Sequence, residues 1–191
     1  MPGKKDLKIT NKKQSNPSLM LIFLVGMPGV GKSYWMKKLS RQFGYEAVDM
    51  DRFIETHTGK SIPELFAAGE MVFRKAEQEA LELLTRRYAG LSCIISTGGG
   101  APCHFQNMDF MLQHGTVIYL KASAGFIRSR IEQSRVERPM FTGMPEEERL
   151  SFIENLMEQR APFYEKATHI VEALSATITT FAGLFHSPSS N

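Results

Sequence analysis

The chain has 191 residues, which is enough for one globular domain with a sizeable apolar core. Its formal net charge of +3 is too small to indicate nucleic-acid binding by itself. The two cysteines, Cys93 and Cys103, form neither a disulfide framework nor a metal-binding pattern, and they suit the reducing cytoplasm. No run of about 18 apolar residues occurs, so we expect a cytoplasmic protein without a membrane span.

The first segment, 1–18, is polar and rich in lysine, and it lacks hydrophobic periodicity. We expect a disordered tail there. A signal peptide is the alternative, because an apolar run follows the basic residues, but no cleavage site of small residues comes after it. A single domain is expected over 19–185, and a second disordered tail over 186–191.

The apolar run Leu21–Val25 predicts a buried strand, and it leads directly into the sequence GMPGVGKS at positions 26–33. This sequence fits the phosphate-binding loop (P-loop) that joins a strand to a helix. Its glycines let the backbone approach phosphate oxygens, which the loop and the helix N-terminus then bind through N–H groups. We expect Lys32 to reach the β- and γ-phosphates of a nucleotide and the Ser33 hydroxyl to bind Mg²⁺.

A helix, Lys32–Phe43, is expected next, and after it a short strand that runs through Asp49 to Asp51. Alternation along a strand would place both aspartates on one side, at the carboxyl end where open α/β sheets bind ligands. One carboxylate would then serve Mg²⁺ and the other a substrate hydroxyl. The alternative is that both aspartates cap a turn or the start of the next helix.

Two helices are expected after this strand, the first capped by Ser61 and the second extending over 69–88. Arg74 lies three residues before Glu77, so their side chains can share a helix face. By position alone, we interpret Arg74 as a solvated surface arginine that pairs with Glu70 or Glu77.

A second apolar strand, 91–96, runs through Thr97 into the glycine triplet Gly98–Gly100. Three successive glycines after a central strand indicate a backbone that something approaches closely, and not a simple turn. Cys103 and His104 follow, and lone residues of these types are more often structural than catalytic.

The remaining elements complete an alternation of strands and helices. They are a helix at 105–114, a strand at 116–120, a helix at Ala124–Glu132, a helix at Glu146–Arg160, a strand at Thr168–Glu172 and a helix of weak propensity at 173–185. Five strands alternating with helices predict a parallel sheet covered on both faces. The arginine-rich stretch 131–145 has no apolar face, and we expect a lid that closes over a nucleotide, with an ordinary surface loop as the alternative.

Taken together, these motifs resemble those of the shikimate kinases, in the nucleoside-monophosphate-kinase-like branch of the P-loop proteins. The specific part is the order and spacing of Asp49-x-Asp51, Gly69-Glu70-x-x-Phe73-Arg74-x-x-Glu77, Gly98-Gly99-Gly100, Arg138-Pro139 and Arg160-x-Pro162-x-Tyr164. The resemblance extends over about 19–171. It implies a three-layer α/β/α fold with a five-stranded parallel sheet, a substrate-binding segment and a lid.

The resemblance also implies site residues. ATP would bind to the P-loop and to two arginines: Gly29, Val30, Gly31, Lys32, Ser33, Tyr34, Arg130 and Arg138. Mg²⁺ would be held by Ser33 and, through water, by Asp49. Shikimate would contact Asp51, Arg74, Gly98, Gly99, Gly100 and Arg160. The catalytic residues would be Lys32, Asp51 and Arg138.

Within these sets the implied roles differ. Arg74 and Arg160 would clamp the substrate carboxylate, which a guanidinium matches in shape, and Asp51 is the candidate base. Arg128 competes with Arg130 for the contact with adenine. The implied reaction transfers the γ-phosphoryl group of ATP to the 3-hydroxyl of shikimate, giving 3-phosphoshikimate and ADP for chorismate biosynthesis. We expect a monomer with no nucleic-acid or membrane partner.

Two features depart from the family's pattern. Tyr34 stands where a small residue is usual, and the segment after Val171 lacks the polar turn that touches adenine, which leaves the contacts of the base open. Three other functions also stay open: a kinase of another small anion such as gluconate, a nucleotide-binding module without catalysis, and nucleic-acid binding through the basic tail. The arginine pair argues against the first and the intact P-loop against the second.

Overall fold

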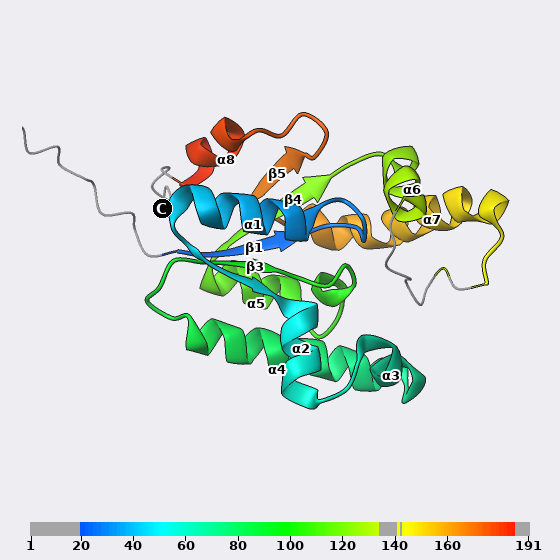
Figure 1. Ribbon diagram of the computed structural model, residues 1–191, viewed down its shortest axis with the longest axis horizontal. Helices are drawn as coiled ribbons and strands as arrows, with labels where there is room; N and C mark the ends of the chain where they lie inside the picture. The colour runs from blue at the N-terminus through cyan, green and yellow to red at the C-terminus, as the bar shows by residue number, and fades with distance from the viewer. Residues whose placement is uncertain (1–19, 134–140, 142, 186–191) are drawn as a thin grey trace, which may run out of the picture.

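Five parallel strands form the centre of the molecule, in the order β2-β3-β1-β4-β5 (Figure 1). The computed structural model describes residues 20–133, 141 and 143–185. The expected five-stranded parallel sheet is confirmed. Its strands are β1 Leu21–Val25, β2 Glu46–Asp49, β3 Cys93–Ser96, β4 Thr116–Lys121 and β5 His169–Glu172.

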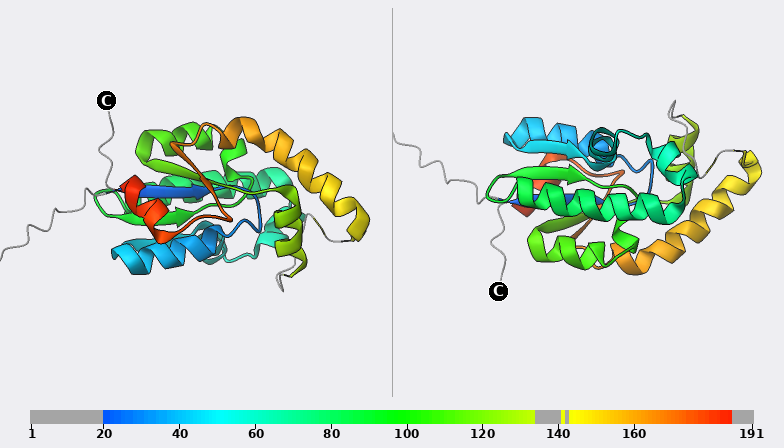
Figure 2. Two further views of the ribbon diagram at one scale, coloured as in Figure 1. Left: turned by 90° about the horizontal axis from the view of Figure 1, so that it is seen from above. Right: turned by 90° about the horizontal axis from the view of Figure 1, so that it is seen from below.

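Helices cover both faces of this sheet, so that the domain has three layers. Figure 2 shows α1 on one face, together with α8, and shows α5 and α7 on the other. The bounds of the helices are α1 Lys32–Phe43, α2 Met50–Thr58, α3 Ile62–Ala67, α4 Glu70–Arg87, the 3-10 helix η1 Ala101–Cys103, α5 Asn107–His114, α6 Ala124–Glu132, α7 Glu146–Tyr164 and α8 Ile178–Phe185.

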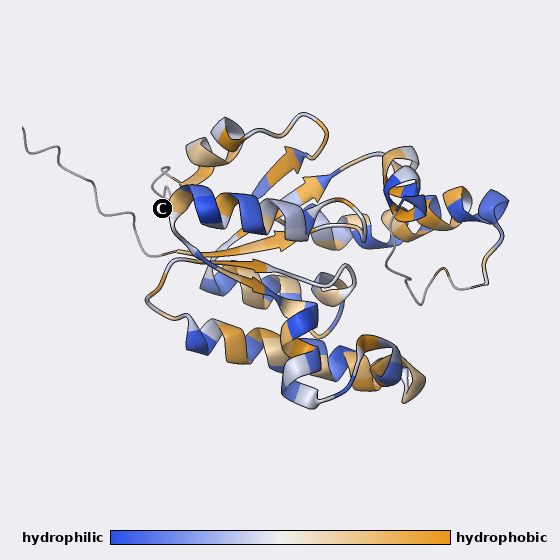
Figure 3. Ribbon diagram, viewed as in Figure 1, coloured by the Kyte–Doolittle hydropathy of each residue, from blue (hydrophilic) through white to orange (hydrophobic). Residues whose placement is uncertain are grey.

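The core lies along the central strands. All residues of β1 are buried, and Phe23 pairs in register with Ile95 of β3 and Val117 of β4. A strand that is covered by helices on both faces needs apolar side chains on both, which explains the continuous apolar sequence. Figure 3 shows mainly hydrophobic strands, surrounded by helices that mix hydrophilic and hydrophobic residues.

Beyond the β2 edge, α2, α3 and α4 pack against one another as a separate small group (Figure 1). Ser61 caps α3 through the expected capping box with Glu64, and the rings of Phe66 and Phe73 lie 4.3 Å apart between α3 and α4. This group positions the side chains of α4 at the carboxyl end of the sheet.

Several element boundaries differ from the expected ones. β2 ends at Asp49, whose carboxylate accepts the Arg52 N–H at 3.5 Å, so Asp51 lies in the first turn of α2 and not on the strand. The helix α7 continues past Arg160 to Tyr164, and α8 begins only at Ile178.

Parts of the expected organisation lie outside the described residues. These parts are the two tails, 1–18 and 186–191, and most of the expected lid, including Arg138. In the stretches that the structure does describe, no helix is both long and apolar enough to cross a bilayer.

Candidate active site

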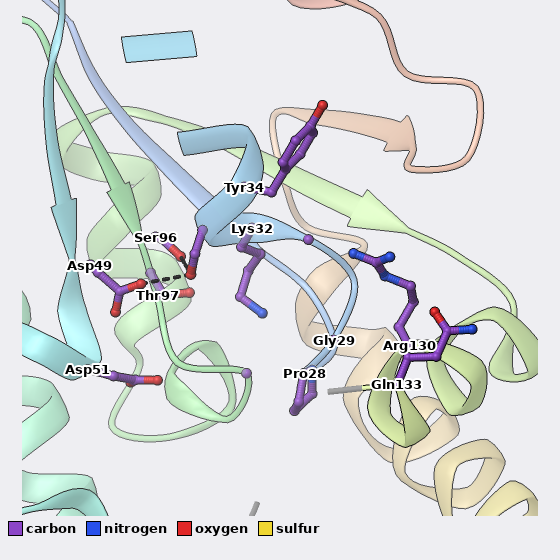
Figure 4. Close-up of a pocket in the computed structure, with 13 residues that line it drawn as sticks. Pro28, Gly29, Lys32, Tyr34, Asp49, Asp51, Ser96, Thr97, Arg130 and Gln133 are labelled. Carbon is purple, nitrogen blue, oxygen red and sulfur yellow. Dashed lines mark hydrogen bonds between the residues drawn. The ribbon is translucent and has the colours of Figure 1, made fainter. Parts of the chain in front are cut away.

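A cleft opens at the carboxyl ends of the strands, where the P-loop leaves β1 (Figure 4). Its volume is about 400 Å³. The cleft is lined by Pro28, Gly29, Gly31, Lys32, Ser33, Tyr34, Asp49, Asp51, Ser96, Thr97, Gly99, Arg130 and Gln133. This position, between β1 and β3 in an open α/β sheet, is where such folds bind ligands.

The P-loop has the backbone that its glycines allow. Gly26, Gly29 and Gly31 have φ angles of 138°, 88° and 105°, which favour glycine at all three positions. Gly31 is the N-cap of α1, and no side chain in the described part of the chain caps that end. The N–H groups at the start of α1 therefore face the cleft as a site for an anion.

Lys32 lies along the inside of this loop. Its ammonium group donates to the carbonyl oxygens of Gly26 at 2.7 Å and Met27 at 3.0 Å, and the side chain is largely buried. The charge is thus held beside the anion site, within reach of a phosphate group bound there.

Oxygen atoms that could act as Mg²⁺ ligands lie close together next to Lys32 in the sequence and on β2. The Ser33 hydroxyl donates to Asp49 Oδ2 at 2.7 Å and lies 3.4 Å from Ser96 Oγ (Figure 4). Mg²⁺ prefers few protein oxygens, completed by water and phosphate, so Ser33 and Asp49 fit this ion. No group of three or more His, Cys, Asp or Glu side chains among the described residues suits a metal, so the protein ligands at this site would be few.

Asp51 lines the cleft on the side away from Tyr34 and Arg130, although it lies on α2 (Figure 4). The expected proximity of Asp49 and Asp51 is present, but the reason is not alternation along a strand. Asp49 caps α2 and Asp51 lies in the first turn of that helix, and both face the same cleft. The helix-cap alternative is therefore confirmed for Asp49, and the roles of the two aspartates toward Mg²⁺ and substrate stay a prediction.

The interpretation of Arg74 as a solvated surface residue is wrong. Its residue exposure is 6%, and its guanidinium lies over the rings of Phe66 and Phe73 at 5.6 and 5.2 Å. Nη1 donates to Glu77 Oε2 at 2.7 Å, and Nε and Nη2 donate to Glu70 Oε1 at 3.2 and 3.0 Å. Arg74 is thus a buried cation held by two carboxylates.

The glycine triplet is needed because side chains of the site crowd its backbone. A Cβ at Gly98 would lie 2.5 Å from Glu77 Oε1, one at Gly99 would lie 2.7 Å from Pro28 Cδ, and one at Gly100 would lie 2.4 Å from Arg74 Nη1. The expected close approach is therefore present, and the approaching groups are the P-loop and the α4 side chains.

Arg160 approaches the same region from α7. It is buried, and Nη1 has no hydrogen-bond partner among the described residues. Four residues further on, the Tyr164 hydroxyl donates to the carbonyl oxygen of Gly99 and so ties α7 to the glycine triplet. A buried guanidinium N–H without an acceptor is costly, so this corner of the site suits an anionic ligand.

Glu77 balances this positive charge. Its side chain is 1% exposed, and burial raises the pKa of its carboxyl to about 7, against the opposing effect of Arg74. The neighbouring charge of Asp51 raises this pKa further.

The other end of the cleft is formed by α6 and the start of α1. Arg130 and Gln133 line it, whereas Arg128 does not line the cleft and pairs with Glu132 at 3.4 Å. Of the two arginines weighed for adenine, the structure thus brings Arg130 to the P-loop. The contact with adenine itself stays a prediction, and Arg138 lies outside the described residues.

The family model for shikimate kinase matches residues 28–182. The chain belongs to the shikimate kinase family. It is 39% identical over 153 residues to the shikimate kinase of Parabacteroides distasonis, covering 80% of this chain and 87% of that protein. It is 37% identical over 153 residues to that of Bacteroides fragilis, covering 80% and 84%.

Solved structures of shikimate kinases have the same fold as this chain. The enzyme from Bacteroides thetaiotaomicron has a TM-score of 0.82 at 31% identity, covering 88% of this chain and 99% of that one. The enzyme from Acinetobacter baumannii in complex with shikimate has a TM-score of 0.76 at 29% identity, covering 88% and 90%. A gluconokinase from Sinorhizobium meliloti, with a TM-score of 0.53 at 14% identity, shares the fold alone.

Sequence reasoning missed several residues that line this shikimate kinase cleft, namely Pro28, Ser96, Thr97 and Gln133. Ser96 and Thr97 end β3 beside β1, and polar residues at the carboxyl end of a neighbouring strand are a signal that could have identified them. Pro28 lies inside the P-loop sequence at 26–33, so that motif could have identified it, whereas Gln133 carries no such signal because only the packing of α6 brings it to the cleft.

Proposed function

We propose that this chain transfers the γ-phosphoryl group of ATP to the 3-hydroxyl of shikimate, with Mg²⁺, giving 3-phosphoshikimate and ADP in aromatic amino acid biosynthesis. The observation that carries the proposal is the pair of buried arginines, Arg74 and Arg160, beside Asp51 and the P-loop. Two guanidinium groups on one side of a phosphate site suit an acceptor that has both a carboxylate and hydroxyl groups. The complex of the Acinetobacter relative with shikimate supports this acceptor.

The acceptor side of the site would bind and orient shikimate. Its carboxylate would take the unpartnered Nη1 of Arg160 and share the guanidinium of Arg74, which Glu77 keeps in place. Backbone N–H groups of Gly99 and Gly100 would hold the ring. The hydroxyl would then face Asp51, which orients it and accepts its proton as the new P–O bond forms.

The donor side would bind the triphosphate. The N-terminus of α1 and Lys32 would hold the β- and γ-phosphates, and Ser33 with Asp49 would hold Mg²⁺, which neutralises charge on the phosphates when it is bound. Phosphoryl transfer needs little covalent work from a protein, so alignment of donor and acceptor supplies most of the rate.

The proposal also covers the lid, the contact with adenine, the oligomeric state and the location of the protein. Arg138 would reach the ATP phosphates from a lid over 131–145, and exclusion of water would suppress ATP hydrolysis. Arg130 would contact adenine. We propose that the protein is a monomer and that it is located in the cytoplasm. Free cysteines suit that location, and the structure has two, Cys93 and Cys103.

The test is an ADP-release assay with ATP and Mg²⁺ that compares shikimate, gluconate and no acceptor. We expect release only with shikimate, and its loss in Lys32→Ala. Phosphorus NMR of the product should show the phosphate on the 3-hydroxyl. Release with gluconate instead, or equal release without any acceptor, would contradict the proposed substrate.

A further inference from the structure

The end of the cleft away from Asp51 contains a side chain whose contact with ATP the proposed function leaves unspecified. Tyr34 lines this end together with Arg130 and Gln133 (Figure 4). It is the only aromatic residue among the described residues that line the cleft. Its exposure is 57%, whereas that of the next residue, Trp35, is 5%.

The Tyr34 ring is held in place by its neighbours. Lys38, one turn along α1, donates to Tyr34 Oη at 3.2 Å, and its ammonium lies 5.4 Å from the ring centroid. The Trp35 ring meets the Tyr34 ring edge-on, with centroids 5.4 Å apart. An exposed aromatic surface that is already ordered loses little conformational entropy when a ligand packs on it.

The P-loop fixes which part of a nucleotide reaches this ring. In the proposed function, the N-terminus of α1 and Lys32 bind the β- and γ-phosphates, and the γ-phosphate must face the acceptor beside Asp51. The α-phosphate, the ribose and the base must therefore leave the cleft at the opposite end. Tyr34 and Arg130 lie at that end (Figure 4).

No residue after β5 lines the cleft in the described part of the chain. Among the described residues, those that line the base end come from α1 and from α6 with its C-cap residue Gln133. Nucleobases stack on aromatic rings and on guanidinium planes, and this end of the cleft offers one of each.

We infer that the Tyr34 ring is a binding surface for the nucleobase, used together with the guanidinium of Arg130. This inference rests on the proposed function in taking ATP as the nucleotide. The affinity of the chain for adenine nucleotides then depends on a side chain that extends from the P-loop helix, and Lys38 acts as the positioning residue for that side chain.

The test separates the base from the phosphates. Binding of Mg²⁺-ADP and of Mg²⁺-pyrophosphate is measured by calorimetry for the wild type, Tyr34→Ala and Tyr34→Phe. Base stacking predicts about 10-fold or greater weakening of ADP binding in Tyr34→Ala, with pyrophosphate binding unchanged. Tyr34→Phe keeps the ring and should bind ADP nearly as the wild type does.

Phe105→Ala is the matched control, because Phe105 is also an exposed aromatic residue but does not line the cleft. It should bind both ligands as the wild type does. Lys38→Met should weaken ADP binding by less than Tyr34→Ala does, again without an effect on pyrophosphate. Retained pyrophosphate binding also shows that each variant keeps a folded P-loop.

Trp35 provides a second readout, since it is the only tryptophan and touches Tyr34. Its fluorescence should change with ADP and not with pyrophosphate. An equal loss of both ligands in Tyr34→Ala, or no loss of ADP binding, would overturn the inference. A wild type that binds ADP but leaves shikimate unphosphorylated would refute the proposed function and leave the Tyr34 test intact.

Discussion

Replacement of Arg74 and replacement of Arg160 would have different consequences for the buried groups around them. Removal of Arg74 strands the buried carboxylate of Glu77, whose partner it is at 2.7 Å, and a buried charge without a partner destabilises the fold. Arg160 has an Nη1 without an acceptor among the described residues. Its removal therefore takes no hydrogen bond of Nη1 from a buried carboxylate. Arg160 is therefore the cleaner residue for a test of the carboxylate clamp.

We predict that Arg160→Met raises KM for shikimate on the order of 10- to 100-fold, the loss expected for one charge-assisted hydrogen bond. KM for ATP should stay near the wild-type value, because the P-loop is untouched. Steady-state kinetics with each substrate varied in turn measures both. Arg41→Met, an exposed arginine in the last turn of α1, is the control, and an unchanged KM for shikimate in Arg160→Met would refute the clamp.

The two aspartates of the cleft should fail in different ways. Asp51→Asn removes the proton acceptor, and we expect kcat to fall roughly 100- to 10,000-fold with little change in ATP affinity. Asp49→Asn, beside Ser33, should instead raise the Mg²⁺ concentration needed for half-maximal rate. Nucleotide binding and Mg²⁺ titrations distinguish them, and equal loss of ATP binding and turnover in Asp51→Asn would contradict a role toward the acceptor.

At the scale of elements, α8 illustrates how packing overrides weak propensity. The segment before and within it contains Thr177, Thr179 and Thr180, which favour helix poorly. Its buried aromatic residues nevertheless anchor it on α1: Phe181 lies 4.7 Å from Trp35 and Phe185 lies 4.9 Å from Phe43, centroid to centroid. The helix depends on these tertiary contacts more than on its own sequence.

Phe181→Ala should therefore lower the free energy of unfolding by about 3–5 kcal/mol, the usual cost of emptying a buried phenylalanine site. Urea denaturation measures the loss, and the emission of Trp35 should shift to longer wavelength as water reaches its ring. Leu174→Ala, at a highly exposed position in the preceding turn, should change stability by less than about 0.5 kcal/mol. Similar effects of both substitutions would mean that α8 contributes little to the core.

The strands and the P-loop could be predicted because their signals are local. Continuous apolar runs such as Leu21–Val25 give buried strands, and the glycine pattern at 26–33 gives the loop. The end of β2 was missed because the Asp49 side chain caps α2, an interaction that competes with continued alternation. The burial of Arg74 was missed because it depends on α3 folding over α4, which no local pattern records.

At the scale of the whole molecule, the buried pair of Glu77 and Arg74 links the site to stability. Burial raises the pKa of Glu77 from its ordinary value of 4.5 to about 7. Between these two values, the folded state holds a proton that the unfolded state has released. Stability from this group is therefore present at low pH and falls as pH rises through the window, because the native state binds more protons there.

Glu77→Gln removes this titration and keeps an amide oxygen that can accept from Arg74. We predict that the free energy of unfolding of the wild type, relative to this variant, falls by up to about 3 kcal/mol from pH 4.5 to 7.5. Urea denaturation of both proteins at several pH values measures the difference, in which titrating groups that do not interact with Glu77 cancel. Glu154→Gln, at an exposed position on α7, should give a flat difference, and a flat difference for Glu77→Gln as well would show that its carboxyl titrates alike in the folded and unfolded chain.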